Sequence, residues 1–269
     1  MLFSILIPVY NVEQYLEDCL NSVLNQSFQG FEVIIVNDGS TDNSLTICAQ
    51  YAKENRSKIS LWNRDNHGLL LTRRFSMSKA KGDYFVFLDS DDMLREDALE
   101  QLSKTIESTK ADLVLYNFSR NTDYSTSGLT LPFATGIPLN KEDVYHEMPT
   151  GHLNNLWKKC VKNTCIDIGV DYSYVKDISR GEDLIQSLPM IDQAKTIVCL
   201  NENLYFYRCN PTSITQTYVC GIFENFKRVA NISQKYYEKW GVDEAYLYQW
   251  RFKKCMFIAI GGKCQLKYT

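Results

Sequence analysis

Residues 84–92 read Tyr-Phe-Val-Phe-Leu-Asp-Ser-Asp-Asp, and this stretch says more about the fold than any other. Its first five side chains are apolar or aromatic, which predicts a buried strand. Three carboxylates then follow within four residues, and such a cluster of like charges is repulsive unless something neutralises it. Mg²⁺ and Mn²⁺ prefer hard oxygen ligands, so Asp89 and Asp91 are candidate metal ligands. The alternative is a solvated acidic turn that precedes the helix expected to start near Arg95.

A second strand ends in a similar way. Residues 31–37 are apolar and β-branched, and the Asp-Gly-Ser sequence of residues 38–40 follows them. An Asp-Gly turn that leads into a helix over 42–56 accounts for these residues without a ligand, although the turn is also compatible with a site. A further strand over 3–9 contains Pro8, which cannot donate to a strand ladder and so belongs at the strand's end.

Strands and helices are expected to alternate along the first 118 residues. The pattern predicts strands over 3–9, 31–37, 59–62, 84–88 and 112–118, with helices over 12–27, 42–56, 68–80 and 95–109. This order predicts an α/β fold, in which a mostly parallel sheet carries helices on both faces. Ligands in such sheets bind outside the carboxyl ends of the strands. Residues 8–10, Asp38 and residues 89–91 should therefore meet in one crevice.

Composition excludes several classes of protein. The chain has 269 residues, a net charge of −3 and a pI of about 5.7, which argues against a nucleic-acid binder. Its three histidines and nine cysteines show neither metal-ligand spacing nor a CxxC pair, so reduced thiols in the cytoplasm are expected. The N-terminus reads as a strand rather than a signal peptide, and no apolar run is long enough to span a membrane.

The last 48 residues differ from the rest in charge. Residues 222–269 carry nine Lys or Arg and four Asp or Glu, together with eleven aromatic side chains. A basic, aromatic pair of helices can lie on an anionic membrane surface or bind a partner. The alternative is that the aromatic side chains complete the core and the lysines form a solvated face.

Five segments together resemble the family 2 glycosyltransferases, which have the GT-A fold. The resemblance covers about 215 residues from the N-terminus, and the segments occur in the family's order. They are Ser4–Asn11, Val36–Asp42, Phe87–Asp92, Gly181–Leu184 and Leu204–Arg208, the last followed by Ser213-Ile214. The resemblance implies a GT-A catalytic domain over 1–215, with a nucleotide-sugar-binding half over about 1–118 and an acceptor-side half over about 119–215. Residues 216–269 are then a C-terminal helical appendage.

The same resemblance implies how a nucleotide-sugar donor binds. The backbone at Pro8, Val9 and Tyr10 would cradle the base, and Asp38 would accept a hydrogen bond from a base N–H, which favours uracil. Asp89 and Ser90 would contact the donor, and Asp91, with Asp89, would hold Mn²⁺ or Mg²⁺ on the diphosphate. Asn66 and Arg73 would lie below the donor, although the family's Ala-Arg-Asn sequence reads Thr-Arg-Arg at residues 72–74. Arg208 would pair with the diphosphate, or else form a surface ion pair.

The catalytic and acceptor residues come from the later motifs. The resemblance implies that Asp183 is the general base, with Glu182 as the second candidate. The alternative is that both acids simply favour the first turn of a helix, where the helix dipole stabilises negative charge. Trp157 and Lys158 fall where the family lines the acceptor side. Trp157 would then stack on a sugar ring, unless it belongs to the core.

The implied function is inverting transfer of a sugar, a hexose or N-acetylhexosamine, from a donor such as a UDP-sugar. The acceptor would be a glycan, a lipid-linked molecule or a glycoprotein, as in cell-surface polysaccharide synthesis. The enzyme would be cytoplasmic, and the C-terminal helices would contact the inner face of the membrane or mediate oligomerisation. Two other classes compete: a phosphoaspartyl-transfer enzyme, which needs its Asp-x-Asp after the first strand, and an inactive scaffold for a partner transferase.

Overall fold

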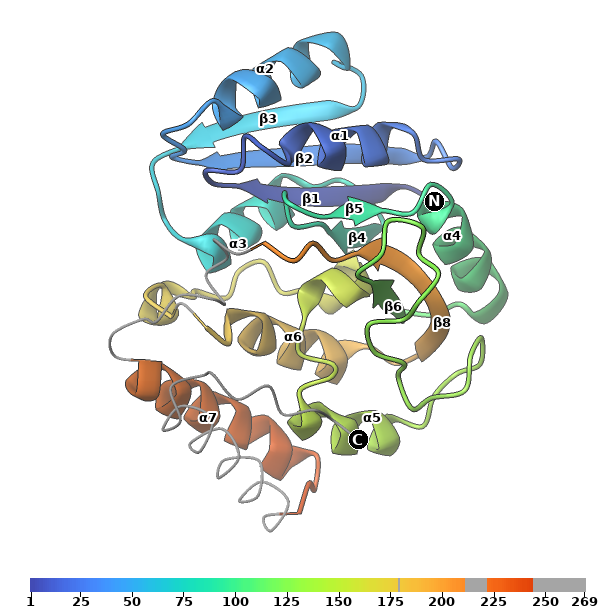
Figure 1. Cartoon of the computed structure of the whole chain (residues 1–269). Helices are drawn as coiled ribbons and strands as arrows, with labels where there is room; N and C mark the ends of the chain where they lie inside the picture. The colour runs from blue at the N-terminus through green and yellow to red at the C-terminus, as the bar shows by residue number, and fades with distance from the viewer. Residues whose placement is uncertain (179, 211–221, 244–269) are drawn as a thin grey trace.

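In the computed structural model of the chain, residues 1–178, 180–210 and 222–243 are described, and strands alternate with helices through the N-terminal half. Four parallel strands form this part of the sheet (Figure 1). The strands are β1 (Phe3–Val9), β2 (Phe31–Asp38), β3 (Ile59–Arg64) and β4 (Tyr84–Phe87), and the helices are α1 (Leu16–Leu24), α2 (Ser44–Glu54) and α3 (Leu69–Lys79). Every strand and helix expected here is present.

The helices are shorter than the sequence predicts, and α1 shows why. A helix from residue 12 would leave its first N–H groups without partners inside the helix. In the structure the N–H of Val12 donates to Ser44 Oγ at 3.0 Å, and the N–H of Glu13 donates to Asp42 Oδ2 at 3.0 Å. Asp42 lies in the turn after β2 and Ser44 is the first residue of α2, so the segment before α1 is attached to the connection between β2 and α2.

The C-terminal half turns the sheet into a mixed one. Strand β7 (Lys159–Lys162) lies between β4 and β6 (Leu113–Ser119) and runs antiparallel to both. Strand β8 (Ile197–Phe206) is parallel to β6, and β5 (Met93–Leu94) is antiparallel to β8. The order of the described strands is β3-β2-β1-β4-β7-β6-β8-β5. The expected fold class is thus confirmed. The antiparallel pairings come from β7, a four-residue strand with two lysines that shows no alternating apolar pattern.

Helices cover both faces of the sheet because successive side chains of a strand point to opposite faces. Ile5 and Ile7 of β1 pack in the core beneath α1, α2 and α4 (Ala98–Thr109), whereas Leu6 packs in the core beneath α3 and α6 (Glu182–Gln193). The remaining helices are α5 (Lys141–Glu147), α7 (Ile222–Lys239) and four short 3₁₀ helices: η1 (Met148–Thr150), η2 (Leu156–Lys158), η3 (Asn163–Cys165) and η4 (Ser173–Val175).

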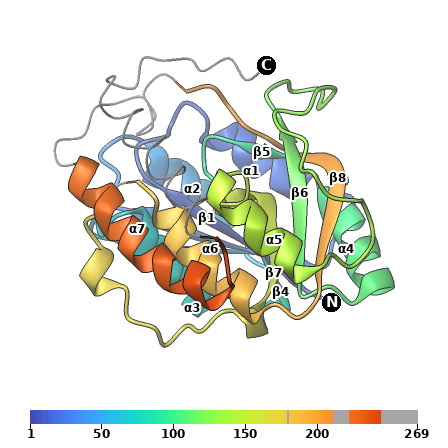
Figure 2. The ribbon, with the colours of Figure 1, turned by 90° about the horizontal axis from the view of Figure 1, so that it is seen from below.

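Helix α7, the first part of the basic tail, lies along α6 (Figure 2). Val229 and Tyr237 on its inner side are buried, and Trp240 stacks on Tyr145 of α5 with ring centroids 4.3 Å apart. For residues 222–243, the buried aromatic side chains therefore do complete the core. Residues 244–269, with their share of the basic charge, lie outside the described residues. Among the described helices, none is long and apolar enough to cross a membrane.

Candidate active site

Arg73 joins two acidic motifs that are far apart in the sequence. Its guanidinium pairs with Asp89 Oδ1 at 2.6 Å and with Asp183 Oδ1 at 2.5 Å. Asp89 follows β4, Asp183 lies in the first turn of α6, and Arg73 itself is 1% exposed in α3. Burial alone lowers the pKa of Arg73, but the carboxylates of Asp183 and Asp89 outweigh it and raise that pKa. The guanidinium is therefore a permanent positive charge between the two motifs.

The first turn of α6 carries two acids whose pKa values are raised. Burial raises the pKa of Asp183, and Asp89 adds to the shift while Arg73 opposes it. Burial and the neighbouring Asp183 raise the pKa of Glu182 to about 7. Asp183 Oδ1 is held by Arg73, whereas its Oδ2 has only the N–H of Leu156, at 3.4 Å, as a partner among the described residues. Oδ2 is thus the more weakly hydrogen-bonded oxygen of Asp183. The raised pKa of Asp183 suits a proton acceptor.

The turn after β4 holds three carboxylates in three different ways. Asp92 is 2% exposed and accepts hydrogen bonds from the hydroxyl of Tyr205 and the N–H of Arg208, both at 2.7 Å. Asp91 Oδ2 accepts one bond from Asn210 at 3.2 Å. Asp92 thereby ties the turn to the end of β8. Neither Asp92 nor Tyr205 was among the residues expected in the site, although the third carboxylate of the acidic run was a visible signal.

The fit of this turn to a divalent cation rests on Asp91. Burial and the charge of Asp89 raise the pKa of Asp91, so its negative charge is poorly compensated. In the described part of the chain no group of three or more His, Cys, Asp or Glu side chains is arranged to hold a metal ion. Asp89 is already paired with Arg73. Asp91 is therefore the carboxylate here that is most open to a hard cation, and a metal site at Asp91 and Asp89 stays a prediction.

Asp38 is buried and its carboxylate is occupied by backbone. Its two oxygens accept hydrogen bonds from the N–H groups of His67 and Gly68, each at 2.9 Å. These residues precede α3, so Asp38 fixes the start of the helix that carries Arg73. The exposed Asn66 packs its backbone against Gly39, where a Cβ would come within 2.8 Å of its nitrogen. Carboxylate oxygens have further lone pairs, and the contact with a base remains a prediction.

The end of β1 lies beside the end of β2, as the sheet order requires. Pro8 pairs with Val36, and Val9 is buried. Tyr10, the next residue, is 49% exposed. Asn11 Oδ1 accepts a hydrogen bond from the N–H of Thr41 at 2.8 Å, which fastens the two strand ends. The ends of β1 and β2 are thus joined, and Tyr10 is exposed beside them. Donor binding at this edge stays a prediction.

Arg208 lies next to the acidic turn. Its Nε donates to the backbone carbonyl of Asp91 at 2.8 Å, and its Nη2 pairs with Asp18 at 3.0 Å. Its guanidinium also lies over the ring of Tyr15, 4.9 Å from the centroid. The surface ion pair that competed with a diphosphate contact is present, and the diphosphate contact stays a prediction.

Trp157 and Lys158 are both buried, which corrects the expected acceptor role. The indole is 5% exposed and packs against Phe118, Tyr205 and Tyr207, with centroids 5.0, 4.7 and 5.2 Å away. Lys158 is 4% exposed, its ammonium donates to the carbonyl of His152, and burial lowers its pKa to about 8. Both residues lead directly into β7, so their side chains enter the core. The indole ring is therefore not open to a sugar.

Lys159 has a buried structural role that nothing in the sequence predicts. Its fully buried ammonium donates to the carbonyls of Leu153 and Asn155, each at 2.5 Å. Ser187 Oγ, one turn after Asp183 on α6, donates to the carbonyl of Asn154 at 2.7 Å. The loop over 152–155 is thus held against the start of α6 by side chains beneath it. A lysine reads as a surface residue, so the sequence gives no signal for this role.

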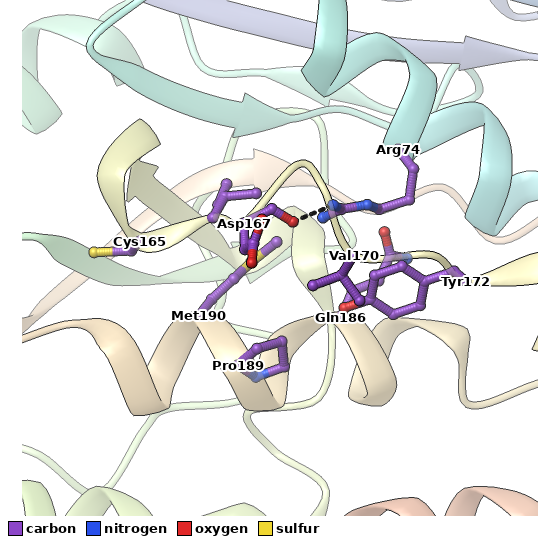
Figure 3. Close-up of a pocket in the computed structure, with 9 residues that line it drawn as sticks. Arg74, Cys165, Asp167, Val170, Tyr172, Gln186, Pro189 and Met190 are labelled. Carbon is purple, nitrogen blue, oxygen red and sulfur yellow. Dashed lines mark hydrogen bonds between the residues drawn. The ribbon is translucent and has the colours of Figure 1, made fainter.

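A small cavity lies elsewhere, between α3 and α6 (Figure 3). It has a volume of about 20 Å³, which is room for a single water molecule. Arg74 reaches across it and donates to the carbonyl of Asp167, while Gln186 and Pro189 line the α6 side. None of the residues expected in the site lines it. The cavity is too small to hold a nucleotide.

The chain belongs to the family described as glycosyl transferase family 2, whose model matches residues 4–157. It is similar to the uncharacterized glycosyltransferase EpsJ of Bacillus subtilis, with 28% identity over 90% of this chain and 71% of EpsJ. It is 31% identical to the putative teichuronic acid biosynthesis glycosyltransferase TuaG of the same organism, over 80% of this chain and 81% of TuaG. It spans 65% of the putative glycosyltransferase EpsH and 32% of the glycosyltransferase GlyA of Streptococcus pneumoniae.

The fold matches that of solved glycosyltransferases. Residues 1–349 of S. aureus TarS, in complex with UDP, superpose with a TM-score of 0.74 and 20% identity, over 99% of this chain and 76% of that one. The likeness shows that the fold is the GT-A fold. It also removes the phosphoaspartyl-transfer alternative, because the Asp-x-Asp follows the fourth strand of the sheet rather than the first.

Proposed function

We propose that the chain is an inverting glycosyltransferase that takes its sugar from a nucleotide diphosphate donor, with UDP as the nucleotide. The observation that carries the proposal is the bridge from Asp89 through Arg73 to Asp183, because it brings the donor motif and the general-base motif together. A donor diphosphate at the acidic turn would lie near Arg73 and Arg208. Both are charge-assisted donors suited to phosphate oxygens.

Asp183 is the proposed general base. An acceptor hydroxyl must lose its proton as it attacks the anomeric carbon. Asp183 Oδ2 is the proposed acceptor of that proton, and the support is its single long hydrogen bond, from the N–H of Leu156 at 3.4 Å. Arg73 holds the other oxygen, so the carboxylate keeps one orientation. The developing positive charge on the sugar resembles that in glycoside hydrolysis, where a nearby carboxylate helps. Glu182, with its pKa of about 7, is the second candidate.

Asp91, with Asp89, is proposed to hold Mn²⁺ or Mg²⁺. Such a cation, when bound, supplies charge neutralisation for the departing diphosphate. The support is the poorly compensated charge of Asp91. Asp38 keeps α3 in place beneath the donor, and Tyr10 presents an exposed ring at the base end of the site.

The relatives support a proposal for the sugar. TarS of S. aureus is named a poly(ribitol-phosphate) β-N-acetylglucosaminyltransferase and has been solved with UDP-GlcNAc, and TuaG is named for teichuronic acid synthesis. We therefore infer an N-acetylhexosamine or hexose donor and a cell-surface polysaccharide or lipid-linked acceptor, used at the cytoplasmic face of the membrane. Residues 244–269, which include Arg251, Lys253 and Lys254, are proposed to add a salt-sensitive membrane or partner contact.

A panel of nucleotide sugars tests the proposal. We expect release of UDP from UDP-GlcNAc or a related UDP-sugar in the presence of Mn²⁺, less release with EDTA, and release slower by about 10²–10⁴-fold from Asp183→Asn. Release of no nucleoside diphosphate from any donor, with UDP still bound, would instead support the inactive scaffold. Flotation with anionic vesicles at low and high salt tests the tail, and equal flotation after Arg251, Lys253 and Lys254 are changed to Gln would eliminate its proposed role.

A further inference from the structure

Helix α7 contacts the candidate active site at Gly181, the residue before Glu182 and Asp183. Gly181 is the N-cap of α6 and has a φ of +95°, a conformation that side chains other than glycine rarely adopt. A Cβ at this position would also lie 2.9 and 3.0 Å from the two methyl carbons of Val229. Val229 of α7 is 2% exposed. The start of α6 is therefore in direct contact with α7 immediately before Glu182 and Asp183.

The same helix also holds the segment that leads to Gly181. Arg228, the neighbour of Val229, pairs with Asp177 at 2.6 Å and donates to the carbonyl of Tyr174 at 2.5 Å. On the other side of this segment, the carbonyl of Lys176 lies 3.6 Å from where a Cβ of Gly68 would be. Gly68 is held by Asp38. The segment over 174–177 is thus bounded by α7 on one side and by Gly68, the residue before α3, on the other.

The far end of α7 is fastened to the end of α6. Lys239 pairs with Asp192 Oδ2 at 2.7 Å, and the indole N–H of Trp240 donates to Asp192 Oδ1 at 2.9 Å. The stack of Trp240 on Tyr145 adds α5 to this attachment. Because α7 is attached near both ends of α6, its position fixes the position of that helix rather than of a single turn.

We propose that α7 is a positioning element of the active site, and that Val229 acts on Asp183 through Gly181. The inference rests on the proposed function, in which Asp183 is the base. Its physical reason is that the pair between Asp183 and Arg73 requires one placement of the first turn of α6, and Val229 fills the space into which that turn would otherwise move. A displacement of about 1 Å at a catalytic group lowers turnover by about 10²-fold.

The test is a double-mutant cycle between the two contact residues. Gly181→Ala strains the backbone at a φ of +95° and also introduces the clash with Val229. We expect it to lower the turnover of UDP-GlcNAc by about 10²-fold with its KM unchanged. Val229→Ala should lower turnover by about threefold to tenfold, because it leaves space beside the turn. In the double variant the clash is gone, so turnover should rise above that of Gly181→Ala by about tenfold. Val242→Ala, also buried but away from Gly181, is the matched control and should keep wild-type turnover.

The outcomes separate this inference from the proposed function. If the wild type turns over its donor and Asp183→Asn loses most of that turnover, these two results support the proposed function, whatever the outcome at Gly181. If Gly181→Ala then turns over normally, or if the double variant is no better than Gly181→Ala, the positioning role is wrong while the function stands. A loss of thermal stability in Val229→Ala without any loss of turnover would likewise reduce α7 to a purely structural helix. A wild type that turns over no donor overturns both.

Discussion

The acidic turn after β4 and the first turn of α6 carry similar residues, yet the protein treats their charges differently. In the turn after β4, Asp92 is saturated by Tyr205 and the N–H of Arg208, whereas Asp91 has one amide at 3.2 Å. In the first turn of α6, Asp183 has the guanidinium of Arg73 on one oxygen and little on the other. Partners from distant segments therefore decide which carboxylate is structural and which is available for chemistry.

The largest effect should come from the first turn of α6. Asp183→Asn keeps the shape of the side chain and removes its ability to accept a proton. We expect turnover to fall by about 10²–10⁴-fold, the usual range for loss of a general base, with UDP affinity retained. Steady-state kinetics and calorimetry with UDP measure the two effects. Normal turnover by Asp183→Asn together with an inactive Glu182→Gln would assign the base to the other acid of the turn.

The bridge between the two turns should matter most for stability. Arg73→Met leaves Asp89 and Asp183 without their cation, and removal of one member of a buried ion pair costs about 3–5 kcal/mol. Denaturant unfolding should show a loss of this size. Arg74→Met is the matched control, because Arg74 donates to a backbone carbonyl and touches neither carboxylate. Similar losses for both variants would mean that the bridge does not couple the two turns.

Within the turn after β4, substitutions of Asp91 and Asp92 should differ in how they change the effect of Mn²⁺ on UDP binding. Asp91→Ala should abolish the improvement that Mn²⁺ gives to UDP binding, an effect of about tenfold, or 1.4 kcal/mol. Asp92→Asn should lower stability and leave the effect of Mn²⁺ in place, because both of its oxygens serve the end of β8. Calorimetry with Mn²⁺ and with EDTA measures this. A Mn²⁺ effect that survives Asp91→Ala would remove Asp91 from the metal site.

The smallest effect concerns the lysines under the 152–155 loop. Burial lowers the pKa of Lys158 to about 8 from an ordinary value of 10.5. Between these two pH values Lys158 is protonated more often in the unfolded chain than in the folded one, so its own contribution to the free energy of unfolding rises with pH. Lys158→Met should remove this contribution, about 1–2 kcal/mol, since each pKa unit corresponds to 1.36 kcal/mol. The buried Lys159, whose pKa is also lowered, contributes in the same direction.

Urea unfolding at pH 7.5 and pH 10 measures that rise. Lys162→Met is the control, because Lys162 is 40% exposed and pairs with Asp112. An equal pH dependence in Lys158→Met and the wild type would show that the Lys158 ammonium is solvated.

The sequence by itself determined the parallel half of the sheet, its helices and the candidate carboxylates. Periodic apolar residues decide a strand or helix locally, and Asp38, Asp89 and Asp91 stand out because charges follow such runs. Asp183 follows no such run, and only the resemblance to the family implied its role. The strand β7 and the burial of Trp157 could not be predicted in this way. Residues 159–162 contain two lysines, and only the carbonyls of the loop over 153–155 make a buried Lys159 stable.

Only the tertiary structure decided how the acidic motifs relate to one another. The sequence places Arg73 in a helix but gives no reason for it to meet both Asp89 and Asp183, because that meeting depends on how α3 and α6 pack on one face of the sheet. The same holds for Val229 and Gly181, whose contact depends on the docking of α7. Local pattern fixes each element because its hydrogen bonds and apolar face are local, whereas the site arises from contacts between elements that no local pattern encodes.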